Sequence, residues 1–117
     1  SEAKARLDAV GGEAEAARRF LAPRVAEGRE GGDAWRLTSL LLYLALATVE
    51  LGEDASAAVE DFARAFEAVP HEEALTLHTM RALAGRLEDA GQFRLAHRVD
   101  ALLEARRAAH RAGFQEE

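Results

Sequence analysis

A helical segment that ends in a glycine recurs along this chain about every forty residues. Its three copies end at Gly11, Gly52 and Gly91, which stand 41 and 39 residues apart. Each glycine is followed by an alanine-rich segment with the composition of a second helix. A repeat of this length is typical of stacked helical hairpins. Such stacks present surfaces to partners rather than assembling active sites, so the repeat favours a binding function.

The composition agrees with an all-helical chain. Apolar residues make up 49% of the 117 positions and aromatic residues only 6%, while alanine, the best helix former, is abundant. No segment shows the alternation of apolar and polar residues that a half-buried strand needs. We therefore predict an all-α fold of three antiparallel helical hairpins, with helices at residues 3–10, 13–26, 34–51, 55–68, 72–90 and 93–112.

These hairpins are expected to form one domain over residues 1–117. An N-terminal hairpin with a linker covers 1–32, a middle hairpin covers 33–70 and a C-terminal hairpin covers 71–113. Pro23 is expected to end or kink the second helix, because proline lacks the amide that a helix interior uses. The stretch 27–32 is then a flexible connection. Asp33 is a good N-cap for the third helix, and Gly113 is expected to end the last one.

The third predicted helix is apolar on every side between Leu40 and Ala47. A helix without a polar face has to be covered on more than one side, since each leucine left in water forgoes about 1.5–3 kcal/mol of burial free energy. Two arrangements meet this requirement. Either neighbouring helices of the same chain enclose the segment, which is the simpler arrangement and the one we favour, or a second copy of the chain covers part of it in a homodimer.

Charge is distributed unevenly along the chain. The net charge of −6 disfavours nucleic-acid binding, which depends on neutralising phosphates with basic side chains. Residues 50–73 contain eight acids and one base, whereas residues 92–112 contain five arginines and two acids. Acids at helix starts and arginines near a helix end account for most of this pattern. Docking of the basic last helix on the acidic middle of a second chain, or on an acidic partner, is the remaining interpretation.

No arrangement of residues indicates catalysis, a cofactor or a metal. The chain has no cysteine. His71 and His78 are seven residues apart, whereas paired ligands on a helix usually stand three or four apart. We therefore expect no catalytic residue, no cofactor and no metal, and a metal protein or enzyme built on these histidines is the least favoured hypothesis. Trp35, at the start of the third helix, is expected to be a packing anchor against Phe20 or Pro23.

The sequence gives no sign of a membrane segment or a secretory leader. The longest apolar run has eight residues, far fewer than the ~20 that span a bilayer, and no basic segment followed by an apolar one stands at the start. Together with the absence of cysteine, this favours a cytoplasmic protein.

The spacing of small and large residues resembles that of tetratricopeptide-type repeats. Ala58, Phe62, Ala65 and Pro70 reproduce the second-helix signature of that family with its own spacing. The last hairpin reproduces the pattern of both helices, with Met80, Leu83, Ala84, Leu87, Gly91, Phe93, Ala96 and Leu103. The resemblance covers residues 34–112. The period of about forty is longer than the 34 residues of this family, and is similar to that of hairpin repeats in bacterial signalling and transcription regulators.

The resemblance implies a short right-handed superhelix whose first helices line a concave groove for a peptide or a partner helix. The residues that it places in the groove are Leu42, Tyr43, Leu46, Glu50, His78, Arg81, Glu88 and Asp89. It implies a non-catalytic protein–protein interaction module, or scaffold, in a bacterial regulatory system. The alternative is a homodimeric helical bundle with a structural or sensory role.

Overall fold

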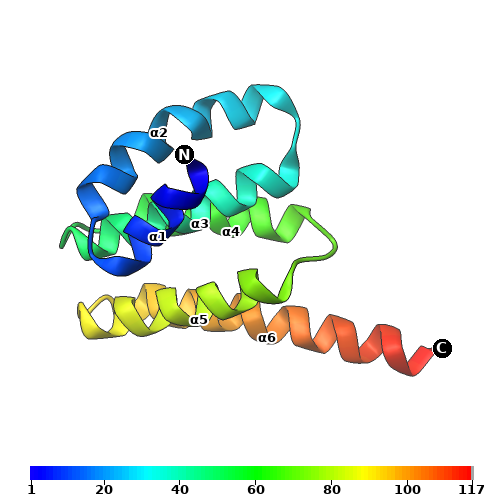
Figure 1. The fold of residues 1–117 in the computed structure, drawn as a ribbon. Helices are drawn as coiled ribbons and strands as arrows, with labels where there is room; N and C mark the ends of the chain where they lie inside the picture. The colour runs from blue at the N-terminus through cyan, green and yellow to red at the C-terminus, as the bar shows by residue number, and fades with distance from the viewer. Residues whose placement is uncertain (117) are drawn as a thin grey trace.

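The structure is a computed structural model that describes residues 1–116, and the side chains of all these except 7, 8, 10, 11 and 114–116. Leu7, Asp8, Val10 and Gly11 of the first repeat are therefore outside the described side chains. The described residues form six α-helices and no strand, which confirms the all-α prediction (Figure 1). The helices are α1 (Glu2–Gly11), α2 (Ala14–Gly31), α3 (Ala34–Glu50), α4 (Ser56–Ala68), α5 (Ala74–Asp89) and α6 (Phe93–Glu116).

The first helices of the three hairpins lie side by side and run parallel. The Tyr43 hydroxyl contacts Thr79 Oγ1 at 3.3 Å, and Glu50 forms an ion pair with Arg86 at 2.5 Å. Both contacts join residues 36 positions apart, so α3 and α5 are parallel in a constant register. Helix α1 also runs beside α3 in the same direction, because Glu2 pairs with Arg36 at 2.6 Å near the starts of both helices and Arg6 lies over Tyr43 further along. We call α1, α3 and α5 the first layer.

The second helices of the hairpins form the other layer. Arg18 of α2 pairs with Glu53 just before α4, and Arg29 pairs with Asp61 further along, at 2.6 and 3.4 Å. Arg98 of α6 pairs with Glu60 of α4 at 3.2 Å. Figure 1 shows the hairpins one above another, with α1–α2 at the top and α5–α6 at the bottom. The thinnest extent of the molecule is 21 Å, which fits two layers of helices each about 10 Å across.

Helix α3 lies at the centre of this arrangement. It packs against α1 and α5 in its own layer and against α2 and α4 of the other layer. The whole run from Leu40 to Ala47 is buried except Leu44, which is half-buried. The prediction that neighbouring helices of the same chain enclose this segment is therefore confirmed. A homodimer through α3 lacks the exposed apolar face that it would need.

The prediction that α2 ends near Ala26 is wrong. The helix runs through Pro23 to Gly31, and Gly32 ends it in a left-handed conformation with φ of 75°. The proline is exposed, so its ring meets no neighbouring helix. Beside it, the Arg24 guanidinium donates to the Phe20 carbonyl at 3.1 Å and stacks on the Phe20 ring. That contact supplies a hydrogen bond in the turn that proline weakens.

Residues 27–31 of the predicted flexible stretch 27–32 thus form the last turns of α2, and Gly28 is buried against α3. Gly113 likewise lies inside α6 rather than at its end. A single glycine costs a helix only about 1 kcal/mol, which the adjoining turns outweigh.

The two hairpin turns that follow α3 and α5 have the same geometry. The Glu53 amide donates to the Thr48 carbonyl at 3.2 Å, and 39 residues later the Gln92 amide donates to the Leu87 carbonyl at 2.8 Å. Gly52 and Gly91 lie between, with φ of 74° and 77°. This pattern is a Schellman motif, in which the residue after the helix adopts a left-handed conformation. The spacing of Gly52 and Gly91 is therefore a structural repeat. In the first hairpin the prediction of Gly11 is off by one residue, because the glycine with positive φ is Gly12, at 100°, and α1 runs to Gly11.

These glycines lead to a stability prediction. Gly52→Ala should destabilise the chain by about 1 kcal/mol, because an L-residue at positive φ is strained. Gly85→Ala is the matched control, because Gly85 lies inside α5 and an added Cβ there meets nothing within 4 Å. It should stabilise by about 0.5–1 kcal/mol. Urea unfolding measures both, and equal effects of the two substitutions would contradict the assignment of the turn.

Candidate partner-binding surface

Three of the residues predicted to line a groove are buried instead. Leu42, Tyr43 and Leu46 are 1%, 6% and 0% exposed. The prediction that they form an accessible groove floor is wrong, because α1 and α5 flank α3 closely within the first layer. Arg6 of α1 places its guanidinium over the Tyr43 ring, 5.5 Å from the centroid, and Thr79 of α5 meets the Tyr43 hydroxyl from the other side.

The other predicted residues divide between two surfaces. Thr79 and Arg86 both contact α3, so they mark the side of α5 that faces it. Arg81 and Glu88 each follow one of these residues by two positions, which is about 200° around a helix. They therefore point away from α3. We call the surface on that side of the α5–α6 hairpin the outer face.

Glu50, His78 and Asp89 lie on the exposed side of the first layer, which we call the layer face. Glu50 and Asp89 line the same shallow hollow of ≈ 250 Å³ between the ends of α3 and α5, together with Val49, Arg86 and Ala90. Within this hollow the Glu50 carboxylate is paired with Arg86. The structure thus brings two of the predicted acidic residues together, next to a base that the sequence analysis did not single out.

Two large apolar side chains outside the predicted groove are exposed near the starts of α3 and α5. Trp35 is 46% exposed and Leu75 is 57% exposed. The prediction that Trp35 is a packing anchor is therefore wrong. In the constant register of α3 and α5, Leu75 lies opposite Ser39, one turn after Trp35. Both apolar side chains therefore lie near the starts of the parallel helices.

A polar contact holds α3 and α5 together beside this apolar pair. The Thr79 hydroxyl donates to the Leu75 carbonyl at 2.8 Å, so its oxygen accepts the hydrogen of the Tyr43 hydroxyl. Both side chains are buried, where an unpaired hydroxyl would cost about 1–3 kcal/mol. The hydrogen bond therefore fixes the register that places Leu75 beside the start of α3.

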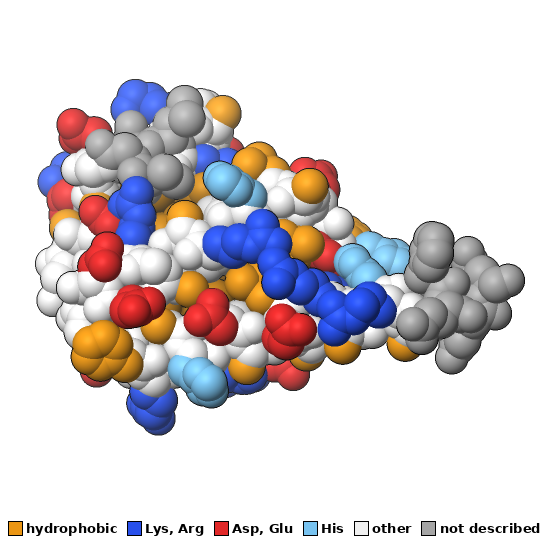
Figure 2. Space-filling view, turned by 90° about the horizontal axis from the view of Figure 1, so that it is seen from below, with side chains coloured by type: hydrophobic (Ala, Val, Ile, Leu, Met, Phe, Trp, Pro, Cys, Tyr) orange, Lys and Arg blue, Asp and Glu red, His pale blue; other side chains and the backbone are white. Residues whose placement is uncertain are grey.

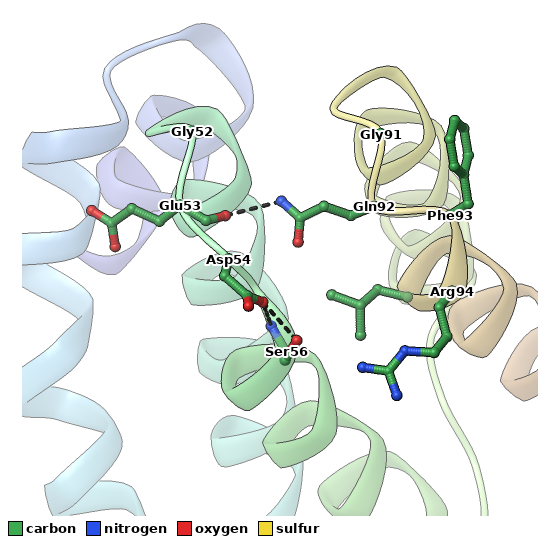
Figure 3. A pocket seen from close by; sticks show the side chains of 9 residues that line it. Gly52, Glu53, Asp54, Ser56, Gly91, Gln92, Phe93 and Arg94 are labelled. Carbon is green, nitrogen blue, oxygen red and sulfur yellow. Dashed lines mark hydrogen bonds between the residues drawn. The ribbon is translucent and has the colours of Figure 1, made fainter.

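A second hollow lies between the two hairpin turns, and we call it the turn cleft (Figure 3). Its volume is ≈ 510 Å³. The side chain of Gln92 crosses it, donating from Nε2 to the Glu53 carbonyl at 2.9 Å and accepting at Oε1 from the Ala55 amide at 3.0 Å. The main-chain carbonyl of the same residue accepts the first hydrogen bond of α6, from Ala96. Gln92 therefore joins the two turns while it starts a helix.

The electrostatics of the turn cleft centre on Asp54. The hydroxyl and the amide of Ser56 both donate to Asp54 Oδ1, at 2.6 and 2.8 Å, and hold the pKa of Asp54 below its ordinary value. Arg94 points into the cleft from α6 and its charge lowers this pKa further, whereas Phe93 points away (Figure 3). The cleft therefore carries opposite charges on its two walls, from Asp54 and Arg94.

The acidic and basic segments seen in the sequence form ion pairs with each other within the chain. Arg98 pairs with Glu60 and Glu67 of α4, and its hydrogen bond with Glu60 raises the pKa of Arg98. Arg106 pairs with Glu72, whose side chain is only 2% exposed. The basic helix thus docks on the acidic segment of its own chain, through the Arg98 and Arg106 ion pairs.

Arg106 also ties α6 to the end of α4. Its guanidinium donates to the carbonyls of Phe66 and Val69 at 2.7 and 2.9 Å and lies 3.9 Å from the centre of the Phe66 ring. Those carbonyls belong to the end of α4 and its cap, where helical partners are missing. His110 Nε2 lies 3.5 Å from the other oxygen of Glu72.

The comparisons with known proteins and the search for metal or membrane sites give no assignment. No family model, no curated protein and no solved structure matches this chain. Among the described side chains, no three acidic or histidine residues lie close enough together to hold a metal ion. Over the described residues, none of the helices combines the length and the apolar character that crossing a bilayer requires.

The clamp across the turn cleft leads to a second stability prediction. Gln92→Ala removes two hydrogen bonds and leaves the part-buried Ala55 amide without its acceptor, so it should destabilise the chain by about 1–3 kcal/mol. Arg94→Ala, on the next residue, removes an exposed side chain and should change stability by less than about 0.5 kcal/mol. Urea unfolding compares the two variants. A Gln92→Ala variant as stable as Arg94→Ala would show that the clamp is not formed.

Proposed function

We propose that this chain is a non-catalytic protein-interaction module of the tetratricopeptide type and that its partner docks on the layer face. The observation that supports the proposal most is the constant 36-residue register of α3 and α5. This register places exposed Trp35 and Leu75 on neighbouring helices, near the starts of both. Parallel first helices in one layer are also the arrangement that the sequence resemblance implies.

The chemistry of the layer face suits a peptide or a partner helix. Tryptophan dominates binding energy at protein interfaces more often than most residues do, because it buries a large rigid area. The apolar pair lies near the starts of α3 and α5, while Glu50 and Asp89 lie near the ends of the same helices. A partner segment with apolar anchors at one end and basic or polar residues at the other matches this distribution. Its orientation along the layer would be fixed by the two ends.

The proposal predicts that the affinity for a peptide ligand depends on Trp35 and Leu75. Peptides selected from a displayed random library against the intact chain should bind Leu75→Ser and Trp35→Ser at least tenfold more weakly, because each change removes an anchor worth about 2 kcal/mol. Titration calorimetry measures the affinities. Trp35 is the only tryptophan, so its fluorescence emission should also shift to shorter wavelength when a ligand covers it in the wild-type chain.

Phe93→Ser provides the control, because Phe93 is a similarly exposed large apolar residue that lies outside the layer face. Its affinity for the selected peptides should equal that of the wild type. Peptides that bind all three variants equally well would place the binding surface elsewhere and overturn the proposal. Circular dichroism confirms that each variant keeps its helices.

A further inference from the structure

The outer face of the α5–α6 hairpin is an exposed side of the last hairpin in the stack. The other sides of this hairpin pack on α3 and α4 through Thr79, Arg86, Arg98 and Arg106. Helical register places a row of charged and aromatic side chains on the outer face, and those named next are all exposed. They are Arg81 and Glu88 of α5, and Phe93, Asp100, Arg107 and Arg111 of α6, with Glu104 at the centre.

The charges on this face are graded along its length. Figure 2 views it from below and shows acidic side chains gathered toward the turn end, at the left, and a row of basic side chains running from the middle toward the C-terminal end of α6. A face with one sign of charge at each end is complementary to a second copy of itself turned end for end. Two-fold symmetric interfaces are built in this self-complementary way.

The positions of the charges can be compared along the hairpin. Asp89 ends α5 and Phe93 begins α6, so these two residues lie level with each other at the turn. Because the helices are antiparallel, each residue counted back from Asp89 lies level with the residue counted equally far forward from Phe93. Glu88 then lies level with Arg94, and Arg81 lies level with Ala101. This register gives every residue of the outer face a position along one axis.

Three pairs of opposite charge have midpoints within one residue of each other on that axis. The midpoint between Asp100 and Arg107 falls at Leu103–Glu104. For the other two pairs, each α5 residue is first assigned the α6 position that lies level with it. The midpoint then falls at Leu102–Leu103 both for Glu88 with Arg111 and for Arg81 with Glu104. A two-fold axis through the outer face near Leu103 lays α6 against α6 of the second copy, so it sets Asp100 opposite Arg107. It also brings the two charged residues of α5, Glu88 and Arg81, level with Arg111 and Glu104 on the adjacent α6 of the second copy.

The same axis pairs two further exposed features. Phe93 is 66% exposed at the turn end. Helix α6 continues past the start of α5, which lies level with Ala108, so its last turns extend beyond the hairpin (Figure 1). Rotation about the axis near Leu103 sets Phe93 of one copy at the level of Gly113 of the other. The exposed ring is then covered by the part of α6 that extends beyond the hairpin.

We propose that two copies of this chain associate antiparallel through the outer faces of their α5–α6 hairpins, about a two-fold axis near Leu103. The interface differs from the layer face, so the dimer leaves both peptide-binding surfaces free. Within one chain, Arg107 and Arg111 lie 3.8 and 3.5 Å from Glu104. These contacts are exposed and therefore weak, so they do not prevent the arginines from pairing with a second copy.

Sedimentation equilibrium of the wild-type chain tests the association directly. At concentrations up to about 100 μM and low salt, we expect a mass of twice 12.7 kDa. Because the contacts are ionic, the dimer should dissociate more readily as salt is added. A wild-type chain that stays monomeric at every concentration overturns the proposal.

Charge exchange tests the geometry of the dimer. The acidic variant carries Arg107→Glu and Arg111→Glu, and the basic variant carries Glu88→Arg and Asp100→Arg. Each variant alone sets like charges opposite each other and should dissociate at least tenfold more readily than the wild type. An equimolar mixture restores every opposite-charge pair and should form a heterodimer with at least the wild-type affinity. A mixture that stays monomeric overturns the antiparallel arrangement.

A matched control changes the same number of charges elsewhere. Glu27→Arg with Glu30→Arg reverses two exposed acids on α2, far from the outer face, and should leave the dimer intact. Loss of the dimer in this control would mean that net charge, and not the outer face, governs association. Peptide binding at the layer face should be unchanged in all these variants, so failure of the dimer and failure of the proposed function are separate results.

Discussion

The structure depends on the enclosure of one helix. Between Leu40 and Ala47 α3 is apolar all round, and each leucine gains about 1.5–3 kcal/mol when it leaves water. No single neighbour can cover such a helix, so the chain surrounds it with α1, α2, α4 and α5. A central helix in a two-layer stack has two neighbours within its own layer and two in the other layer. The position of α3 therefore determines the arrangement of the helices around it.

Enclosure of α3 also decides where binding can take place. A side chain in the middle of this helix has a neighbour in every direction, as the burial of Tyr43 beneath Arg6 shows. Side chains at the ends of helices and on the last hairpin lack such neighbours. Among the described side chains, the exposed large apolar residues are accordingly Trp35, Leu75 and Phe93, each in the first two positions of its helix. Candidate binding surfaces therefore lie on the helices, or parts of helices, that have no neighbour on one side.

The sequence predicts well whatever depends on a pattern along one helix. The apolar run of α3 indicated its enclosure, and Gly52 and Gly91 marked two turns that have the same hydrogen bonds. Rules for single residues failed where adjoining turns outweighed them, as at Pro23 inside α2. The candidate site was predicted poorly, because the exposure of Leu42 or Trp35 depends on where α1 and α5 lie. Contacts between residues more than thirty positions apart set those positions, and no local pattern encodes them.

Helix α6 shows how one sequence pattern can serve two purposes. Its arginines looked like a single basic segment, yet consecutive residues of a helix point about 100° apart. Arg106 is consequently 10% exposed and neutralised by Glu72, whereas its neighbour Arg107 is 44% exposed. The inward arginines hold α6 on the acidic α4 and complete the fold. Because they no longer contribute free charge, the polarity of the outer face comes from the outward residues alone. The field that a second molecule meets is therefore opposite in sign at the two ends of the hairpin, although the chain as a whole is acidic.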